Sequence, residues 1–125
     1  MSQPIDTGAL LSRSYELPSG PRVRLRLVRR SDLRGIEALL AQRDVPASEL
    51  ALSRLVRYHP SRRAVICATA ALGGGETVVG VGSIDLTAEA EPDTLVVDER
   101  LTSGLAELLA AALVQRARAH ARRVA

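Results

Sequence analysis

The sequence has almost no aromatic residues and lacks several residue types on which common sites depend. Tyr15 and Tyr58 are the only members of this class, because phenylalanine and tryptophan are absent. An aromatic platform that stacks single-stranded nucleic acid is thereby excluded, and the core must be aliphatic. The chain also lacks lysine. This absence excludes Schiff-base chemistry and the lysine of phosphate-binding loops.

Cysteine is limited to Cys67, so an internal disulfide bond is excluded. With only two histidines besides, a tetrahedral Cys/His zinc site is excluded too, and we expect no metal. Cys67 alternates with Val65 and Thr69 on an apolar segment. This pattern is typical of a buried, unreactive thiol rather than a nucleophile.

Long apolar runs are also missing, so no segment is expected to span a bilayer. The polar start of the chain lacks the basic-then-apolar pattern of a signal peptide. We therefore expect a cytoplasmic protein without a membrane partner. What is present, 125 residues with 46% hydrophobic and 25% charged side chains, indicates one globular domain. The net charge of +3 is too small to indicate a nucleic-acid-binding tail.

The first half of the chain predicts an arm, a strand and two helices. Residues 1–20 are expected to form a flexible N-terminal arm with a short extended piece at Ser14–Leu17, and residues 21–125 one domain. Apolar residues alternate with arginines from Arg22 to Leu27, which predicts a half-buried strand. Ser31 and Asp32 are expected to cap the first helix. The second helix is expected to start near Pro46 and to end before His59.

The second half predicts three strands and a long helix. Ala64–Leu72 has little polar content and is expected to be a strand buried on both faces. Gly73–Gly75 predicts a hairpin turn into a second strand at Thr77–Leu86, in which Gly80 and Gly82 indicate a bulge or the close approach of another backbone. A short strand at Thr94–Val97 then precedes a helix from about Gly104 to about Arg123. The order β-α-α-β-β-β-α predicts an α+β fold, with three helices against a mostly antiparallel sheet of about four strands.

Three of these segments, in this order, resemble the GNAT superfamily of N-acetyltransferases. Residues 23–33 resemble the opening strand and the turn into the first helix, and residues 77–84 resemble the third strand of the family. Val96–Glu99 followed by Gly104–Ala106 resembles the fourth strand entering the cofactor loop. The likeness covers residues 21–125 and implies a partial GNAT fold with acyltransferase activity.

In the family, the cofactor loop has Arg or Gln, two variable residues, Gly, one more residue, and Gly or Ala. Gly104 and Ala106 occupy the small positions, whereas Leu101 occupies the Arg/Gln position. The resemblance implies that backbone N–H groups at the helix start hold acetyl-CoA or another acyl-CoA. The residues it assigns to this role are Val97, Thr102, Ser103, Gly104, Leu105 and Ala106. The departure at Leu101 implies weak binding.

The family continues beyond this helix with a fifth strand, and its usual acid, a tyrosine, lies beyond that strand. The resemblance therefore implies a truncated or degenerate member that lacks the C-terminal part of the fold and has an incomplete active site. The strand at Thr94–Val97 would then be an unpaired sheet edge. We expect a homodimer or a partner subunit to complete the sheet there. Whether the protein is an enzyme stays open, with acetyl-CoA-dependent acetylation of an amine as the leading hypothesis.

Carboxylates near this loop are the candidates for a general base. Asp98 and Glu99, with Asp85 as a third, would deprotonate the amine if burial raised the pKa of one of them. The alternative is that Asp98 and Glu99 solvate the loop or interact with the positive end of the following helix.

Two functions of other classes remain open. One is a non-catalytic dimerisation or interaction module derived from the same fold. The other is a nucleic-acid-associated regulator that acts through the basic residues of the last helix, namely Arg116, Arg118, His120, Arg122 and Arg123. A solvated helix face is the simpler interpretation of that basic cluster, as it is for Arg22, Arg24 and Arg26.

Overall fold

The computed structural model describes residues 13–18, 20–46, 48–72, 75–87 and 91–124, which form one five-stranded antiparallel sheet with helices on both faces. The strands lie in sequence order: β1 (Ser14–Glu16), β2 (Arg22–Leu27), β3 (Arg63–Leu72), β4 (Gly75–Asp85) and β5 (Thr94–Val97). The helices are α1 (Leu33–Gln42), α2 (Glu49–Val56) and α3 (Thr102–Val124), and the 3-10 turns η1 (Arg30–Asp32) and η2 (Glu99–Leu101) precede α1 and α3. The predicted α+β fold is confirmed, with one strand more than expected.

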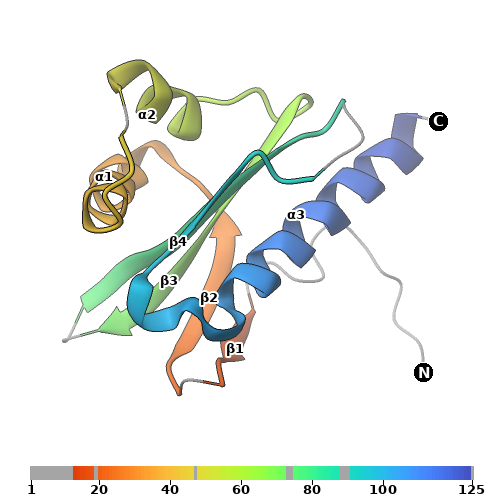
Figure 1. Ribbon diagram of the computed structural model, residues 1–125. Helices are drawn as coiled ribbons and strands as arrows, with labels where there is room; N and C mark the ends of the chain where they lie inside the picture. Colours follow the sequence, from red (N-terminus) through yellow and green to blue (C-terminus); the bar gives the residue numbers. More distant parts are fainter. Residues whose placement is uncertain (1–12, 19, 47, 73–74, 88–90, 125) are drawn as a thin grey trace, which may run out of the picture.

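Two helical layers cover the sheet, with α1 and α2 on one face and α3 along the other (Figure 1). Alternate strand positions therefore supply two separate hydrophobic clusters. The cluster under α3 includes Val23, Leu25, Ile66, Val79, Leu105 and Leu109. The cluster under α1 and α2 includes Val28, Ile36, Leu40, Val65, Cys67 and Val81. Because β3 contributes to both clusters, the prediction that it is buried on both faces is confirmed.

The strand β1 lies at the end of the predicted arm and belongs to the sheet. Tyr15 pairs with Val23 of β2, and Leu17 is only 5% exposed and joins the cluster under α3. The extended piece expected at residues 14–17 is therefore present, and the folded part of the chain includes it. Residues 1–12 lie outside the described residues, so the rest of the predicted arm stays a prediction.

The glycines of β4 allow α3 to lie close to the sheet. A Cβ atom at Gly80 would lie 2.7 Å from Leu109 Cδ1, and one at Gly82 would lie 2.7 Å from Leu113 Cδ1. The close approach expected here is real. Side chains of α3 make it at both glycines, and at Gly82 a Cβ atom would also lie 3.3 Å from the backbone carbonyl oxygen of Thr94 in β5. The register between β3 and β4 also shifts between Ala68 and Thr69, which confirms the expected bulge.

The starts of two helices differ from the sequence-based prediction. Asp32 does not cap α1 with its side chain. Its carboxylate instead accepts hydrogen bonds from Nη1 and Nη2 of Arg26, at 2.7 and 2.6 Å, and from the backbone N–H of Arg29, at 2.7 Å. The helix α2 begins after Ser48 rather than near Pro46, because the Ser48 hydroxyl accepts a hydrogen bond from the N–H of Ala51 at 3.1 Å.

Candidate functional site

The chain turns from β5 into α3 through a single 3-10 turn, and α3 begins at Thr102, close to the start expected near Gly104. The N–H of Asp98 donates to the carbonyl of Val79 (2.7 Å), and the N–H of Leu101 donates to the carbonyl of Asp98 (2.9 Å). These bonds direct the turn toward the face of the sheet that α3 covers. Leu101, only 3% exposed, packs in the cluster under α3. The position where a phosphate-binding loop would have Arg or Gln is thus part of the core.

Gly104 has a backbone conformation that favours glycine. Its φ of +87° lies in the left-handed region, and a Cβ atom there would lie 3.0 Å from Cδ of Pro18. The small residue at this position is therefore explained by the turn into α3 and by contact with the segment after β1. The N–H groups of the first helical turn have no acceptor within the helix, and they are the groups here that attract an anion.

The other residues of the predicted cofactor loop divide into three kinds. Val97 and Leu105 are buried in the cluster under α3, so only their backbone atoms are available to a ligand. Ala106 is partly buried against the same cluster. Thr102 and Ser103 belong to α3, but their side chains lie outside the described residues.

Asp98 is a buried carboxylate whose hydrogen-bonding capacity is used within the protein. It is 2% exposed and accepts hydrogen bonds from the backbone N–H, Nε and Nη2 of Arg100, at 2.8, 3.0 and 2.8 Å, and from Nε2 of Gln42 at 3.2 Å. The Arg100 side chain has the largest effect and lowers the pKa of Asp98 to about 2, although burial opposes it. Asp98 is therefore ionised at neutral pH and is a poor proton acceptor. It joins the end of α1 to the turn before α3.

The two other candidate bases lie at the surface or in a turn. The Glu99 side chain is 62% exposed, with Arg43 Nη1 at 3.5 Å from its Oε2. Asp85 accepts hydrogen bonds from the N–H and the hydroxyl of Thr87, at 2.8 and 2.7 Å, and so stabilises the turn after β4. Of the three carboxylates, Glu99 is the one at this corner that solvent reaches freely.

A hollow of about 360 Å³ lies between α1 and the start of β4 and reaches the same corner. Asp98 and Arg100 line one part of it, and Gly35, Gln42 and Val78 line others. A Cβ atom at Gly35 would lie 2.7 Å from Cγ2 of Val78, so α1 lies directly against β4 there. The hollow is a surface groove rather than a slot that continues through the sheet.

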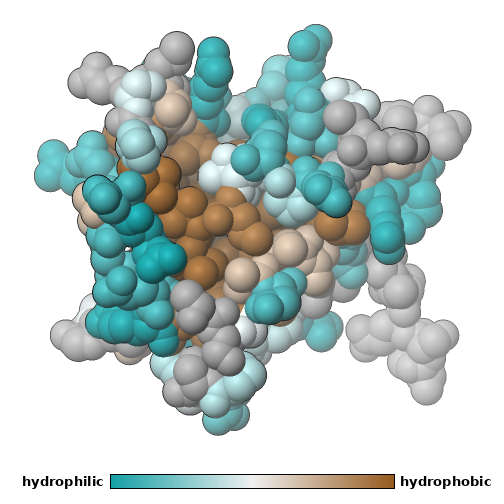
Figure 2. All heavy atoms as spheres, in the orientation of Figure 1, coloured by the Kyte–Doolittle hydropathy of each residue, from teal (hydrophilic) through white to brown (hydrophobic). Residues whose placement is uncertain are grey.

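The edge strand β5 has hydrophobic side chains exposed beside it. Within the described residues, β5 pairs only with β4. Leu95 of β5 is 39% exposed, and Val45 after α1 is 37% exposed. A hollow of about 290 Å³ lies next to the strand and is lined by Leu40, Val45, Pro46, Leu55, Thr94 and Val96, among others. In the space-filling view, hydrophobic side chains gather at the centre of the face between the α1–α2 pair and α3 (Figure 2).

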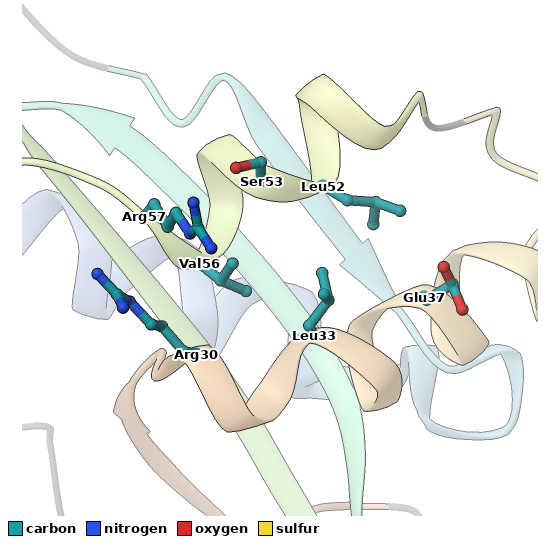
Figure 3. Close-up of a pocket in the computed structure, with 7 residues that line it drawn as sticks. All are labelled: Arg30, Leu33, Glu37, Leu52, Ser53, Val56 and Arg57. Atoms are coloured by element: carbon teal, nitrogen blue, oxygen red, sulfur yellow. The ribbon is translucent and has the colours of Figure 1, made fainter.

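A second apolar hollow, of about 330 Å³, separates α1 from α2. Leu33, Leu52 and Val56 project into it from the two helices, Arg30 and Arg57 lie toward one end, and Glu37 lies toward the other (Figure 3). None of these residues belongs to the predicted site. Leu52 and Val56 lie four residues apart, as on one face of a helix, but this spacing gives no sign that Leu33 leaves a groove opposite them.

The structure also places Cys67 and the basic residues of the last helix. Cys67 is fully buried, and burial raises the pKa of its thiol to about 12. The basic side chains of the second half of α3 form no ion pair with any described residue. Within the described residues, no group of three or more His, Cys, Asp or Glu side chains could hold a metal ion, and no helix is long and apolar enough to cross a membrane.

Comparison with known proteins identifies the fold. No protein-family model matches the sequence, and no curated protein matches it. A search of solved structures finds the GNAT domain of S. lividans PAT, with a TM-score of 0.65 and 17% sequence identity. The match covers 93% of this chain and 77% of the other. The chain therefore has the GNAT fold, and at this identity the likeness extends to the fold alone.

Proposed function

We propose that the protein binds an acyl-CoA weakly at the amino end of α3, and that it acetylates an amine only when a partner chain completes the cleft beside β5. The observation that carries this proposal is the corner where the edge strand β5 leads through η2 directly into α3, in a chain with the GNAT fold. The unpaired N–H groups and the dipole of a helix start favour a pyrophosphate.

Three features of the corner support weak binding. Leu101 is buried and provides no charge or hydrogen bond to a ligand. The Asp98 carboxylate is ionised and already accepts the backbone N–H of Arg100, which is one of the donors near the helix start. The Arg100 guanidinium is paired with this carboxylate, so its positive charge is already compensated within the protein.

The chemistry requires a group that accepts the proton of the amine. The amine nitrogen attacks the thioester carbonyl, the C–N bond forms while the C–S bond breaks, and CoA leaves as a thiol that takes up a proton. Asp98 is a poor acceptor because its pKa is low and its oxygens are occupied. Glu99 is the exposed carboxylate at the corner and is the proton acceptor in this proposal.

Thermal unfolding in the presence of acetyl-CoA tests the binding step. A ligand that binds the folded state raises Tm, so we expect a small rise at millimolar acetyl-CoA and none with acetyl-pantetheine, which lacks the pyrophosphate. Ala106→Glu adds a negative charge near the amino end of α3 and should abolish the rise in Tm. Ala111→Glu adds the same charge at an exposed position farther along the helix, and this variant should still show the rise in Tm. The absence of any rise with the unmodified chain would contradict the proposal.

A non-catalytic interaction module is the second candidate, and the exposed hydrophobic side chains beside β5 favour it. A second copy of the chain that paired along β5 would cover Leu95 and extend the sheet. Acetyl-CoA binding and self-association, measured on the same preparation, separate the two candidates. Self-association without a ligand-dependent rise in Tm supports the module, and binding that strengthens with association supports the acyltransferase.

A further inference from the structure

A fourth hollow lies on the face of the sheet that α1 and α2 only partly cover, next to the start of α1. Its volume is about 280 Å³, at the small end of the range for ligand pockets. It is lined by Arg24, Arg26, Arg29, Thr69, Glu76 and Val78. None of these residues belongs to the corner between β5 and α3, although Glu76 and Val78 also line the hollow between α1 and β4 that reaches it. The proposed function uses neither residue, so the two proposals are tested separately.

The sheet register places these side chains in one group. Arg24 of β2 lies opposite Thr69 of β3, and Thr69 lies opposite Val78 of β4. Cross-strand neighbours in an antiparallel sheet project from the same face. Arg26 follows Arg24 on that face, and Arg29 lies in the segment that leads into α1. Three guanidinium groups therefore surround one spot.

Their charges are only partly compensated within the protein. Arg26 makes a two-pronged ion pair with Asp32, and its Nε lies 4.0 Å from Oε1 of Glu76. Arg24 and Arg29 form no ion pair with any described residue. Three guanidinium groups against two carboxylates leave one net positive charge, which favours an anionic group.

Thr69 provides an independent sign of a ligand. Thr69 is 4% exposed and lines the hollow, yet its hydroxyl forms no hydrogen bond within the described part of the chain. Among the described residues, every side-chain nitrogen or oxygen that is fully buried has a hydrogen-bond partner. Since the Thr69 hydroxyl has none, it is not fully buried, and a small molecule in the hollow can reach it. Buried hydroxyl groups normally have a hydrogen-bond partner. An oxyanion held by Arg24 and Arg29 would accept a hydrogen bond from the Thr69 hydroxyl.

We propose that the hollow formed by Arg24, Arg26, Arg29 and Thr69 binds the oxyanion of a small molecule, a carboxylate or a phosphate ester. Arg24 and Arg29 donate charge-assisted hydrogen bonds to it, and the Thr69 hydroxyl donates a third. Arg26 is held by its ion pair with Asp32, so it adds positive charge to the site without donating a hydrogen bond to the ligand. Glu76 lies at the exposed rim, where its side chain is 62% exposed.

Titration with inorganic phosphate and with acetate, at an ionic strength held constant with sodium chloride, tests the site. We expect a saturable rise in Tm with at least one of the two anions, since either binds the folded state. Saturation with phosphate alone would assign the ligand to the phosphate esters, and saturation with acetate alone to the carboxylates. A rise that sodium chloride reproduces at the same ionic strength would overturn the proposal.

Variants of β2 provide a matched control. Arg24→Gln and Arg22→Gln each remove one positive charge from exposed positions on the same face of the strand, but Arg22 does not line the hollow. Arg24→Gln should weaken anion binding about tenfold, and Arg22→Gln should leave it within about twofold. Thr69→Val keeps the shape of the side chain and should weaken binding several-fold. Equal effects of the two arginine variants would show that anions respond to the overall positive charge of the strand rather than to a site, and would contradict the proposal.

Discussion

Asp98 illustrates how strongly the surroundings of one carboxylate determine its chemistry. From the sequence it was a candidate base, since it follows a strand at the mouth of the expected cofactor loop. In the structure it accepts four hydrogen bonds and its pKa is lowered to about 2. A position next to a site therefore does not make a carboxylate a proton acceptor when a neighbouring guanidinium group binds it.

Asp98→Asn should destabilise the fold by about 1 to 2 kcal/mol, because the ion pair with Arg100 is lost. The loss is small because solvent partly screens this pair in the unmodified chain. The folded-state pKa lies below the ordinary value, so this stabilisation is complete above about pH 4 and is lost as the pH falls toward about 2. Urea unfolding of both chains from pH 7 to pH 2 measures the difference. Glu99→Gln is the exposed control and should change little. A constant difference down to pH 2 would contradict the assigned role.

Gly104→Ala should cost about 1 to 3 kcal/mol, because alanine is strained at φ +87° and its Cβ would press on Pro18. Gly20→Ala separates the two causes. Gly20 has φ +110°, but a Cβ atom there would meet nothing within 4 Å, so only the backbone strain applies. Chemical denaturation of both variants gives the comparison, and a smaller loss at residue 104 than at residue 20 would argue against the Pro18 contact.

Among the elements, those with a strong local signal could be predicted from the sequence. Alternation from Arg22 to Leu27 and the short apolar run at Thr94–Val97 correspond to β2 and β5 as predicted. The sequence predicts a start of α2 near Pro46, because proline suits the first turn of a helix. The helix instead begins after Ser48, whose hydroxyl accepts a hydrogen bond from the N–H of Ala51. The hollow of Arg24, Arg29 and Thr69 could not be predicted, since it depends on the register between strands far apart in the sequence.

Gly80→Ala should destabilise the contact between β4 and α3 by about 1 to 3 kcal/mol, because its Cβ would lie 2.7 Å from the fully buried Leu109. Gly75→Ala, on the same strand with nothing within 4 Å, should be close to neutral. Equilibrium unfolding of both variants measures the contrast. Combining Gly80→Ala with Leu109→Ala should recover part of the loss due to the glycine change, and strict additivity of the two effects would count against a direct clash.

At the scale of the whole molecule, we propose that a second copy or another chain extends the sheet at β5, the edge strand that pairs only with β4 among the described residues. We expect self-association at micromolar concentration, measured by sedimentation equilibrium, and Leu95→Glu should weaken it by about tenfold or more. Leu33→Glu is the matched control, because Leu33 is 38% exposed against 39% for Leu95 but lies in the groove between α1 and α2. A chain that stays monomeric throughout this range, or equal effects of the two changes, would contradict pairing through β5.

The contact between Pro18 and Gly104 also has a practical consequence for shortened versions of this chain. Pro18 follows the first strand and lies beside the turn that opens the last helix, although the two positions are far apart in the sequence. An expression clone that starts after Gly20 would remove β1 and, with it, the support beneath that turn. Removing the N-terminal residues up to Gly20 is therefore expected to affect the start of α3 as well.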